Sequence, residues 1–315
     1  MSPLAHKRPA LNPDSSLRRI GVIGLGHMGG DFAANLIADG YQVTVYDCNE
    51  KHIAPFVAKG AIGAAGIGDL AGCDAVLTSV PDDDALADVT AGDGGLVNVL
   101  APGAIHVSMS TVSPGLSRRL AEAHRVAGQS YVAAPVLGNP DLARARKLFL
   151  LVAGAPPAVA RVKPVLERLG QRVFLLGDDA GTANLMKVAA NALTALTLQS
   201  MGEVLALLHK GGLPPQIAFD VLTGSLFDGK VHKNYGGKIV AGRYSPPGMT
   251  TPLAVKDLRL ALAEAEHLAV PMPAASLVHD RLVAVIARGW AELDWSALGL
   301  LAAAEAGLPA NVQGV

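Results

Sequence analysis

The sequence predicts an α/β fold: a doubly wound parallel sheet over residues 18–179, followed by an all-α domain over residues 180–315. Three observations lead to this fold class. Short apolar runs alternate with helical patterns, a strand–glycine turn–helix–strand unit lies at residues 18–47, and no strand-like run follows residue 181. The 315 residues suffice for two domains with large cores. Residues 1–17 contain three prolines and no sustained apolar pattern, so we expect a disordered tail there.

The unit at residues 18–47 has the order typical of a Rossmann dinucleotide site. An apolar run leads into Gly24, Gly26 and Gly29, and a helical pattern follows. Gly24 would make the tight turn, Gly26 would let the backbone approach a pyrophosphate, and Gly29 would let the helix pack on the sheet. Free N–H groups at the helix start would then face the anion. The predicted cofactor residues of this turn are Gly24, Leu25, Gly26, His27, Met28 and Gly29.

The second strand, at residues 43–46, ends in Asp47, which lies 18 residues after Gly29. That offset is near the one expected for an acid that binds a ribose 2′-hydroxyl. A carboxylate there repels a 2′-phosphate, so we predict NAD as the cofactor. NADP stays open, because Lys51 and His52 could offset the repulsion.

Further strands are expected at residues 75–80, 104–107, 131–133, 148–152 and 173–176. Ligands of such sheets bind at the carboxyl edge of the strands. Val80 and Pro81, and Ser110 and Thr111, begin loops at that edge and are candidate cofactor contacts. Ser110 and Thr111 could instead cap the helix that starts near Pro114.

The all-α part begins with a helical pattern over residues 181–210, a long interdomain helix that ends at paired glycines. Further helices are expected at residues 215–222, 252–268 and 273–288, with a loop at 236–251. The abundance of alanine and glycine suggests tight helix packing through small side chains. Because ligand sites favour domain interfaces, we expect the chemistry near the start of the long helix.

Asn184, Lys187 and Asn191 form a polar stripe on this otherwise apolar helix, at spacings i, i+3 and i+7. Burial and a nearby cationic nicotinamide would both lower the pKa of Lys187. Its neutral amine could then take the proton of an alcohol while hydride leaves the same carbon. The alternative is a surface lysine whose stem packs along the helix.

Composition narrows the possible partners. The formal net charge is −1, and no apolar run approaches the length of a membrane span, so we expect neither nucleic acid nor membrane as a partner. The two cysteines, Cys48 and Cys73, have no metal-ligand spacing and suit a reducing compartment. We therefore expect a cytoplasmic protein without a metal site, acting on a small-molecule substrate.

Four segments together resemble the β-hydroxyacid dehydrogenase superfamily, in particular the 3-hydroxyisobutyrate dehydrogenases. They are GLGHMG at 24–29, AAPVLGN at 133–139, GTANLMKVAAN at 181–191 and KDLRLAL at 256–262. The resemblance implies that Lys187 is the catalytic acid/base and that Asn191 orients the substrate. It also implies that Lys256 contacts the cofactor near the nicotinamide, and that Val80 and Pro81 cover its adenosine side. Without it, Lys256 would be interpreted as part of a solvated helix start.

Two positions depart from the family pattern. The family commonly has DAPVSGG, in which a serine and glycines hold a substrate carboxylate, whereas this chain has Val136, Leu137, Gly138 and Asn139 in the substrate segment. Backbone N–H groups of Leu137, Gly138 and Asn139 could still bind an anion, in a more apolar pocket. The second departure is Ala183, where the family often has glycine.

The predicted function is hydride transfer between a β-hydroxyacid, or a related secondary alcohol, and a nicotinamide cofactor. One alternative is an imine reductase, although those enzymes usually carry aspartate or tyrosine at the position of Lys187 and commonly prefer NADP. Another is a non-catalytic dinucleotide-binding protein. The apolar long helix further predicts a homodimer or homotetramer that buries it.

Overall fold

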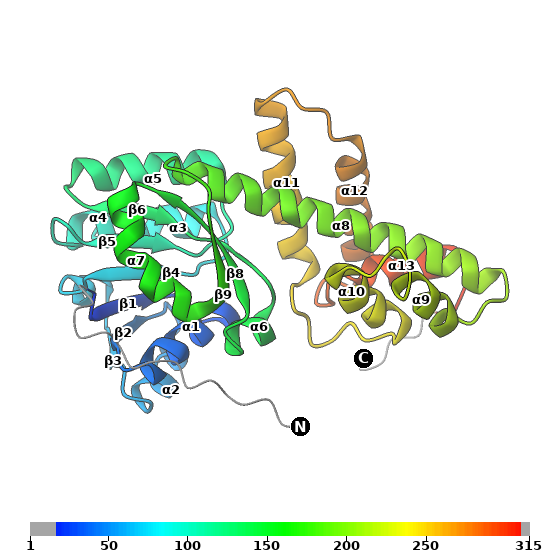
Figure 1. The fold of residues 1–315 in the computed structure, drawn as a ribbon, viewed down its shortest axis with the longest axis horizontal. Coiled ribbons are helices and arrows are strands. Elements are labelled where there is room, and N and C mark those ends of the chain that lie inside the picture. Colours follow the sequence, from blue (N-terminus) through cyan, green and yellow to red (C-terminus); the bar gives the residue numbers. More distant parts are fainter. Residues whose placement is uncertain (1–16, 310–315) are drawn as a thin grey trace. The chain divides into compact units, whose positions relative to one another are not determined.

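The computed structural model describes residues 17–309, which divide into two compact units between Lys187 and Val188 (Figure 1). The predicted tail at residues 1–16 lies outside this range. Leu17, also expected in the tail, is instead buried in the core with 1% exposure. The strands are β1 Arg19–Ile23, β2 Gln42–Tyr46, β3 Ile62–Gly63, β4 Ala75–Thr78, β5 Ile105–Ser108, β6 Ser130–Ala133, β7 Val136–Leu137, β8 Leu148–Gly154 and β9 Gly170–Leu175. The helices of the first unit are α1 His27–Ala38, α2 Ala54–Val57, α3 Asp83–Ala91, α4 Leu96–Val99, α5 Pro114–Val126, α6 Pro140–Arg144 and α7 Pro156–Leu169.

The strands of the first unit form one mostly parallel sheet in the order β3-β2-β1-β4-β5-β6-β8-β7, with β9 paired to β8. The expected α/β doubly wound fold is confirmed. The sheet departs from parallel pairing at β8, which runs antiparallel to β6 and β7. The short strands β3 and β7 were not predicted, since two residues give no readable periodicity.

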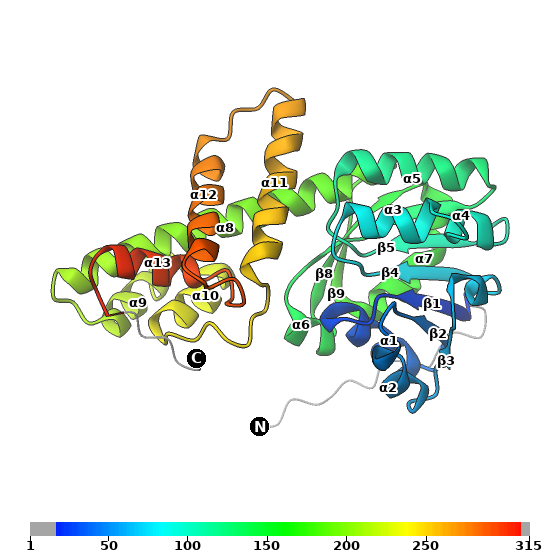
Figure 2. The ribbon, with the colours of Figure 1, turned by 180° about the vertical axis from the view of Figure 1, so that it is seen from behind.

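Helices cover both faces of this sheet, as Figures 1 and 2 show from opposite sides. On one side α1 contacts α6 and α7, and on the other α3 contacts α4 and α5. Strands that are buried on both faces have nearly continuous apolar sequences. Accordingly, every residue of β4 and β5 is buried, His106 among them.

A chain of buried polar side chains crosses this core. The side chain of Gln129 donates to the carbonyl groups of Val97 and Leu100, so its Oε1 must accept from His124 Nδ1, at 2.6 Å. For neutral rings, His106 Nδ1 then donates to His124 Nε2 at 2.9 Å, and the hydroxyl of Thr78 donates to His106 Nε2 at 2.9 Å. Each bond thus fixes the direction of the next, and burial disfavours an added proton on either ring by lowering the pKa of both.

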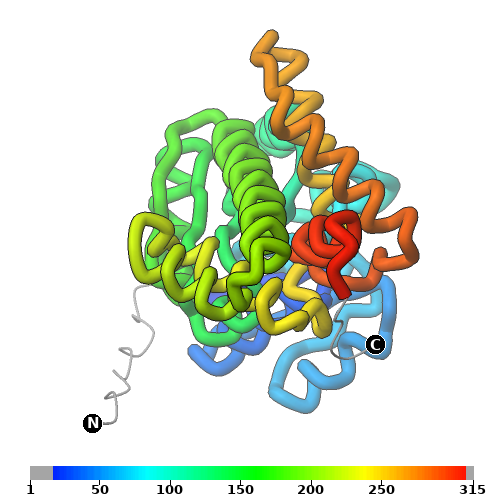
Figure 3. The backbone as a smooth tube through the Cα atoms, turned by 90° about the vertical axis from the view of Figure 1, so that its right-hand side faces the viewer, coloured from blue at the N-terminus to red at the C-terminus, as the bar shows by residue number. Residues whose placement is uncertain are grey.

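The second unit is helical. It comprises most of α8 (Ala180–Lys210), then α9 Pro215–Thr223, α10 Lys230–Val240, α11 Thr251–His267, α12 Pro273–Ala287 and α13 Ala297–Glu305. Figure 3 shows α11 and α12 side by side, in orange. Residues 236–240 were expected in a loop but belong to α10, and α13 was not predicted. No helix within residues 17–309 is long and apolar enough to cross a membrane.

Small residues let these helices approach closely, as the composition suggested. A Cβ on Gly202 would lie 2.7 Å from the Cα of Gly299, and one on Gly236 would lie 2.8 Å from Met201 Cε. Gly236, which was expected to begin a loop, therefore serves packing inside a helix.

The histidine chain predicts acid sensitivity of the first unit. Burial lowers the pKa of His106 well below its ordinary value, with a further contribution from His124, and burial lowers the pKa of His124 as well. Below about pH 6.5 the unfolded chain binds protons that the folded chain excludes, so stability falls as the pH falls. At about pH 5.5 the loss reaches up to about 1.4 kcal/mol per histidine.

Urea unfolding at pH 5.5 and 7.5 measures this loss. We expect His209→Gln, which removes an exposed histidine, to keep the difference between the two pH values. The double variant His106→Leu/His124→Leu should be less stable at pH 7.5 but show a smaller difference. Equal stability of the wild-type protein at both pH values would contradict the assignment.

Candidate active site

The glycine turn after β1 has the geometry that a dinucleotide requires. Gly24 has a φ of +84°, and a Cβ there would lie 2.2 Å from the carbonyl oxygen of Ser79. A Cβ on Gly29 would lie 1.9 Å from the carbonyl oxygen of Gly24, so only glycine permits this approach of helix and strand. Gly26, by contrast, faces open space and begins α1 without a side-chain cap. Its backbone leaves room for a pyrophosphate at the helix N-terminus, and the residues present therefore fit a dinucleotide.

The side chains between these glycines take different directions. Leu25 is 6% exposed and packs in the core, and Met28 packs against the same cluster. His27 is exposed. The side chains of Leu25 and Met28 thus serve packing, and the N–H of Leu25 donates to Asp47.

Asp47 follows β2 and is tied to the glycine turn. Its Oδ2 accepts from the N–H of Leu25 at 2.7 Å, its Oδ1 accepts from the N–H of Asn49 at 2.9 Å, and Nδ1 of His52 lies 3.2 Å from Oδ1. Burial alone would raise the pKa of Asp47, but these three partners outweigh it and hold the pKa below its usual range. A charged acid therefore stands at this position, and His52 is directed at it.

The loops after β4 and β5 lie at the same carboxyl edge and are bonded to each other. The N–H of Val80 donates to Ser110 Oγ at 2.9 Å. Thr111 is half-buried and Pro81 is exposed. The cap of α5 is Ser113, whose Oγ accepts from the N–H of Leu116, so Ser110 and Thr111 are not the cap. The predicted cofactor residues of the four central strands thus converge on one edge.

The predicted substrate segment turns most of its side chains inward. Val136 is buried, and Leu137 packs against the cluster that contains Ala183. Leu137 pairs with Phe149 of β8, and the alternation of the antiparallel ladder assigns its N–H to that pairing. The side chain of Asn139 caps α6 by accepting from the N–H of Leu142 at 3.0 Å. The backbone of Gly138 and Asn139 remains as the candidate anion contact.

The start of α8 is fastened to α5 by two contacts. Arg118 Nε donates to Asp179 Oδ2 at 2.9 Å, and Asp179 Oδ1 accepts from the N–H of Gly181 at 2.9 Å. One turn later, Asn184 Nδ2 donates to Ser117 Oγ at 2.6 Å. These contacts set the position of the first turns of α8, which carry Lys187. Neither Ser117 nor Arg118 was singled out from the sequence.

Lys187 and Asn191 are both buried, with 7% and 5% exposure, on one face of α8. Asn191 Nδ2 donates to Asp257 Oδ2 at 2.5 Å, and Lys256 Nζ lies 2.8 Å from Asp257 Oδ1. Asp257 therefore joins two predicted site residues, Asn191 and Lys256, and orients the amide of Asn191. The surface interpretation of Lys256 is excluded, because its side chain is only 13% exposed. The signal for Asp257 was present in the KD pair at the start of the 256–262 segment.

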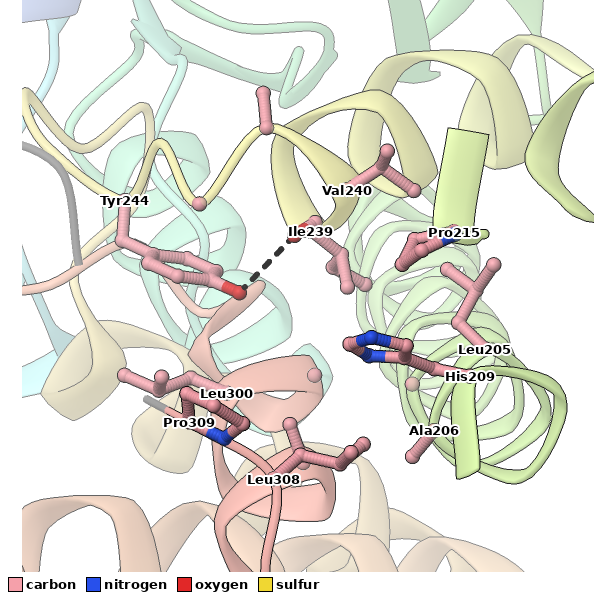
Figure 4. Close-up of a pocket in the computed structure, with 15 residues that line it drawn as sticks. Leu205, Ala206, His209, Pro215, Ile239, Val240, Tyr244, Leu300, Leu308 and Pro309 are labelled. Carbon is pink, nitrogen blue, oxygen red and sulfur yellow. Dashed lines mark hydrogen bonds between the residues drawn. The ribbon is translucent and has the colours of Figure 1, made fainter. Parts of the chain in front are cut away.

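A pocket of about 190 Å³ lies in the helical unit, away from these residues (Figure 4). Its lining is mainly apolar, with Leu205, Ile239 and Leu300 among its walls, and the hydroxyl of Tyr244 donates to the carbonyl of Ile239. The pocket contains none of the predicted site residues. No group of three or more metal-ligating side chains that could hold a metal occurs in residues 17–309.

Comparison with known families covers both units. Residues 19–177 match the NAD-binding domain of 6-phosphogluconate dehydrogenase, and residues 181–302 match the NAD-binding domain of NADP-dependent 3-hydroxyisobutyrate dehydrogenase. The chain belongs to the β-hydroxyacid dehydrogenase superfamily. The two matches are separated by residues 178–180, where α8 begins, whereas the compact units divide at Lys187, inside that continuous helix.

Relatives in this superfamily match over most of their lengths. An uncharacterized oxidoreductase of Bacillus subtilis is 38% identical over 282 residues, which are 89% of this chain and 98% of the relative. The 3-hydroxyisobutyrate dehydrogenase of Pseudomonas aeruginosa is 32% identical, over 89% of this chain and 96% of the relative. The 3-sulfolactaldehyde reductase of Escherichia coli is 31% identical, over 93% and 99%. The protein is thus an oxidoreductase of the hydroxyacid dehydrogenase type that uses a nicotinamide dinucleotide.

Solved structures support the same assignment. A 3-hydroxyisobutyrate dehydrogenase from Salmonella typhimurium has a TM-score of 0.80 at 26% identity, covering 89% of this chain and 98% of its own. The enzyme from Mycobacterium tuberculosis, described with L-serine, has a TM-score of 0.81 at 26% identity, covering 90% and 98%. An imine reductase from Myxococcus stipitatus has a TM-score of 0.62 at 22% identity, covering 90% and 99%, which shows a shared fold alone.

Proposed function

We propose that the protein oxidises a β-hydroxyacid or a related secondary alcohol with NAD, in a reversible reaction with Lys187 as the general acid/base. The observation that carries the proposal is a buried lysine on α8, one helical turn from an asparagine whose amide is fixed by Asp257. Relatives named as hydroxyacid dehydrogenases and aldehyde reductases support the substrate class.

Each residue then has a definite task. The amine of Lys187 takes the hydroxyl proton of the substrate during oxidation and returns it during reduction. The Nδ2 of Asn191 donates to Asp257, which orients the amide, and we assign its Oδ1 to accept a hydrogen bond from the reacting hydroxyl. The backbone of Gly138 and Asn139 holds a substrate anion. The nicotinamide, when bound, accepts or returns the hydride.

Asp47 supports NAD over NADP as the cofactor. Its carboxylate is charged and bonded to the glycine turn, where it would accept a ribose hydroxyl and repel a 2′-phosphate. His52, which could have attracted that phosphate, is directed at Asp47 instead.

We further propose that a second copy of the chain covers part of the helical unit. Leu193 and Leu207 of α8 are 66% and 71% exposed, and Leu277 of α12 is 57% exposed. Contiguous exposed apolar surface is typical of an interface, and we assign these leucines to one. This proposal extends the predicted homodimer or homotetramer.

Replacing the catalytic lysine tests the proposed reaction. We expect Lys187→Met to retain NAD binding but to lower kcat by about two to four orders of magnitude, because a general acid/base is lost. Nicotinamide absorbance, followed with hydroxyacids, other alcohols and cyclic imines, measures the turnover. Lys163→Met, which removes an exposed lysine of the first unit, is the control. Wild-type turnover in Lys187→Met would exclude this role.

Asp47→Asn tests the cofactor preference. The change removes the charge while keeping an oxygen for the glycine turn, so NAD should weaken and the ratio of kcat/KM for NADP over NAD should rise by about 10- to 100-fold. Asp74→Asn is matched, since Asp74 also accepts from backbone N–H groups, those of Arg18 and Arg19, but precedes β4 at the opposite edge. A wild-type enzyme that prefers NADP would refute the proposal.

Light scattering tests the assembly. We expect a mass of at least twice the 32.2 kDa of one chain. Leu207→Glu should shift the mass downward, because it places a charge on the covered face, whereas Val126→Glu, at an exposed position of the first unit, should not. A wild-type mass of a single chain would end this proposal.

A further inference from the structure

The first turns of α8 hold a buried polar atom without a partner. Asn184 is 0% exposed, and its Oδ1 has no hydrogen-bond partner among the described residues, although its Nδ2 donates to Ser117. Turning the amide over would only leave its nitrogen unsatisfied instead. A buried acceptor without a partner calls for an explanation, and a catalytic role is one of those known.

Asn184 cannot turn away to find a partner, because its anchor is itself held. The Oγ of Ser117 lies 3.2 Å from the hydroxyl of Tyr131. The ring of Tyr131 meets His106 edge to face at 5.1 Å and stacks on His124 at 5.9 Å. The two buried histidines thus pack against the tyrosine whose hydroxyl contacts Ser117, the partner of Asn184.

Lys187 lies three residues after Asn184 on the same helix face, where Cβ atoms are about 5–6 Å apart. After it takes a proton, the lysine is an ammonium with three donors and no acceptor. Such a group, 7% exposed, requires acceptors from the protein. The Oδ1 of Asn184, a buried acceptor one helical turn before Lys187, is a candidate for this task.

We propose that Asn184 is a positioning residue for Lys187, whose ammonium donates a hydrogen bond to Asn184 Oδ1. The inference rests on the proposed acid/base role of Lys187. In the oxidation the O–H bond of the alcohol breaks, its proton forms a bond to the lone pair of Lys187 Nζ, and the hydride carries two electrons from carbon to the nicotinamide. Asn184 stabilises the state that follows the proton transfer.

Charged groups on neighbouring elements are engaged with other partners. Arg118 of α5 and Asp179 pair with each other, and Asp83 of α3 accepts from the hydroxyl of Ser113 at 2.5 Å. Further along α8, Asn191 donates to Asp257, which pairs with Lys256. The buried histidines 106 and 124 are bonded in their own chain. A substitution of Asn184 therefore removes the acceptor that we assign to the ammonium of Lys187 and leaves these charged pairs in place.

The test uses two substitutions of Asn184 with opposite expected effects. Oxidation needs the neutral amine, so kcat rises with pH around the pKa of Lys187. Asn184→Leu keeps the shape but removes the acceptor, and should move the midpoint of this rise to lower pH by about one unit. Asn184→Asp should move it to higher pH by about one unit or more.

The control is Gln199→Leu, which also removes a buried amide with an unpartnered oxygen from α8, three helical turns after Lys187. It should leave the midpoint unchanged. Thermal unfolding shows which variants fold, and Asn184→Ala replaces Asn184→Leu if the latter does not.

Coinciding midpoints for folded Asn184→Leu, Asn184→Asp and the wild-type enzyme would overturn the inference. If Lys187→Met abolishes the pH-dependent rise while the Asn184 variants leave it in place, the inference alone fails. If Lys187→Met turns over like the wild-type enzyme, the proposed function itself fails.

Discussion

The hydrogen bond from Asn184 to Ser117 fastens the start of α8 to the sheet domain, and the proposed chemistry depends on it. Together with the pair of Arg118 and Asp179, it sets the first turns of the helix that carries Lys187. The bond is itself supported from the core, because Tyr131 packs against the two histidines bonded between Thr78 and Gln129. A buried polar network stabilises one arrangement when its members are satisfied, and we assign its unpartnered atom, Asn184 Oδ1, to the ammonium of Lys187.

Much of the fold could be predicted because its signals are local. Strand, glycine turn and helix follow one another within residues 18–47, and the long helix ends at paired glycines close to the observed Lys210. The reversed strand β8 could not be foreseen, since strand direction depends on pairing between distant segments. Helix α10 was missed because a loop was expected from residue 236 onward, whereas Gly236 lies inside the helix and its missing side chain makes room for Met201. Glycine thus occurs both in loops and at close contacts between helices, and the sequence alone does not distinguish the two.

The candidate site divides in the same way. The glycine turn and the stripe of Lys187 and Asn191 could be predicted, because each depends on residue spacing within one segment. Contacts between elements stayed hidden, including that of Asp257 with Asn191 and that of Asp47 with the N–H of Leu25. Both contacts hold a predicted site residue in position, and neither changes which residues were predicted. A histidine inside the apolar run of β5 was the one sequence signal for the buried chain.

The central claim is that the amine of Lys187 acts on the hydroxyl of the substrate. A crystal structure of the enzyme with NAD and a non-reacting hydroxyacid analogue tests it most directly. We expect Lys187 Nζ within about 3 Å of the oxygen on the carbon that faces the nicotinamide. An amine directed to bulk solvent, with another side chain bonded to that oxygen, would contradict the claim.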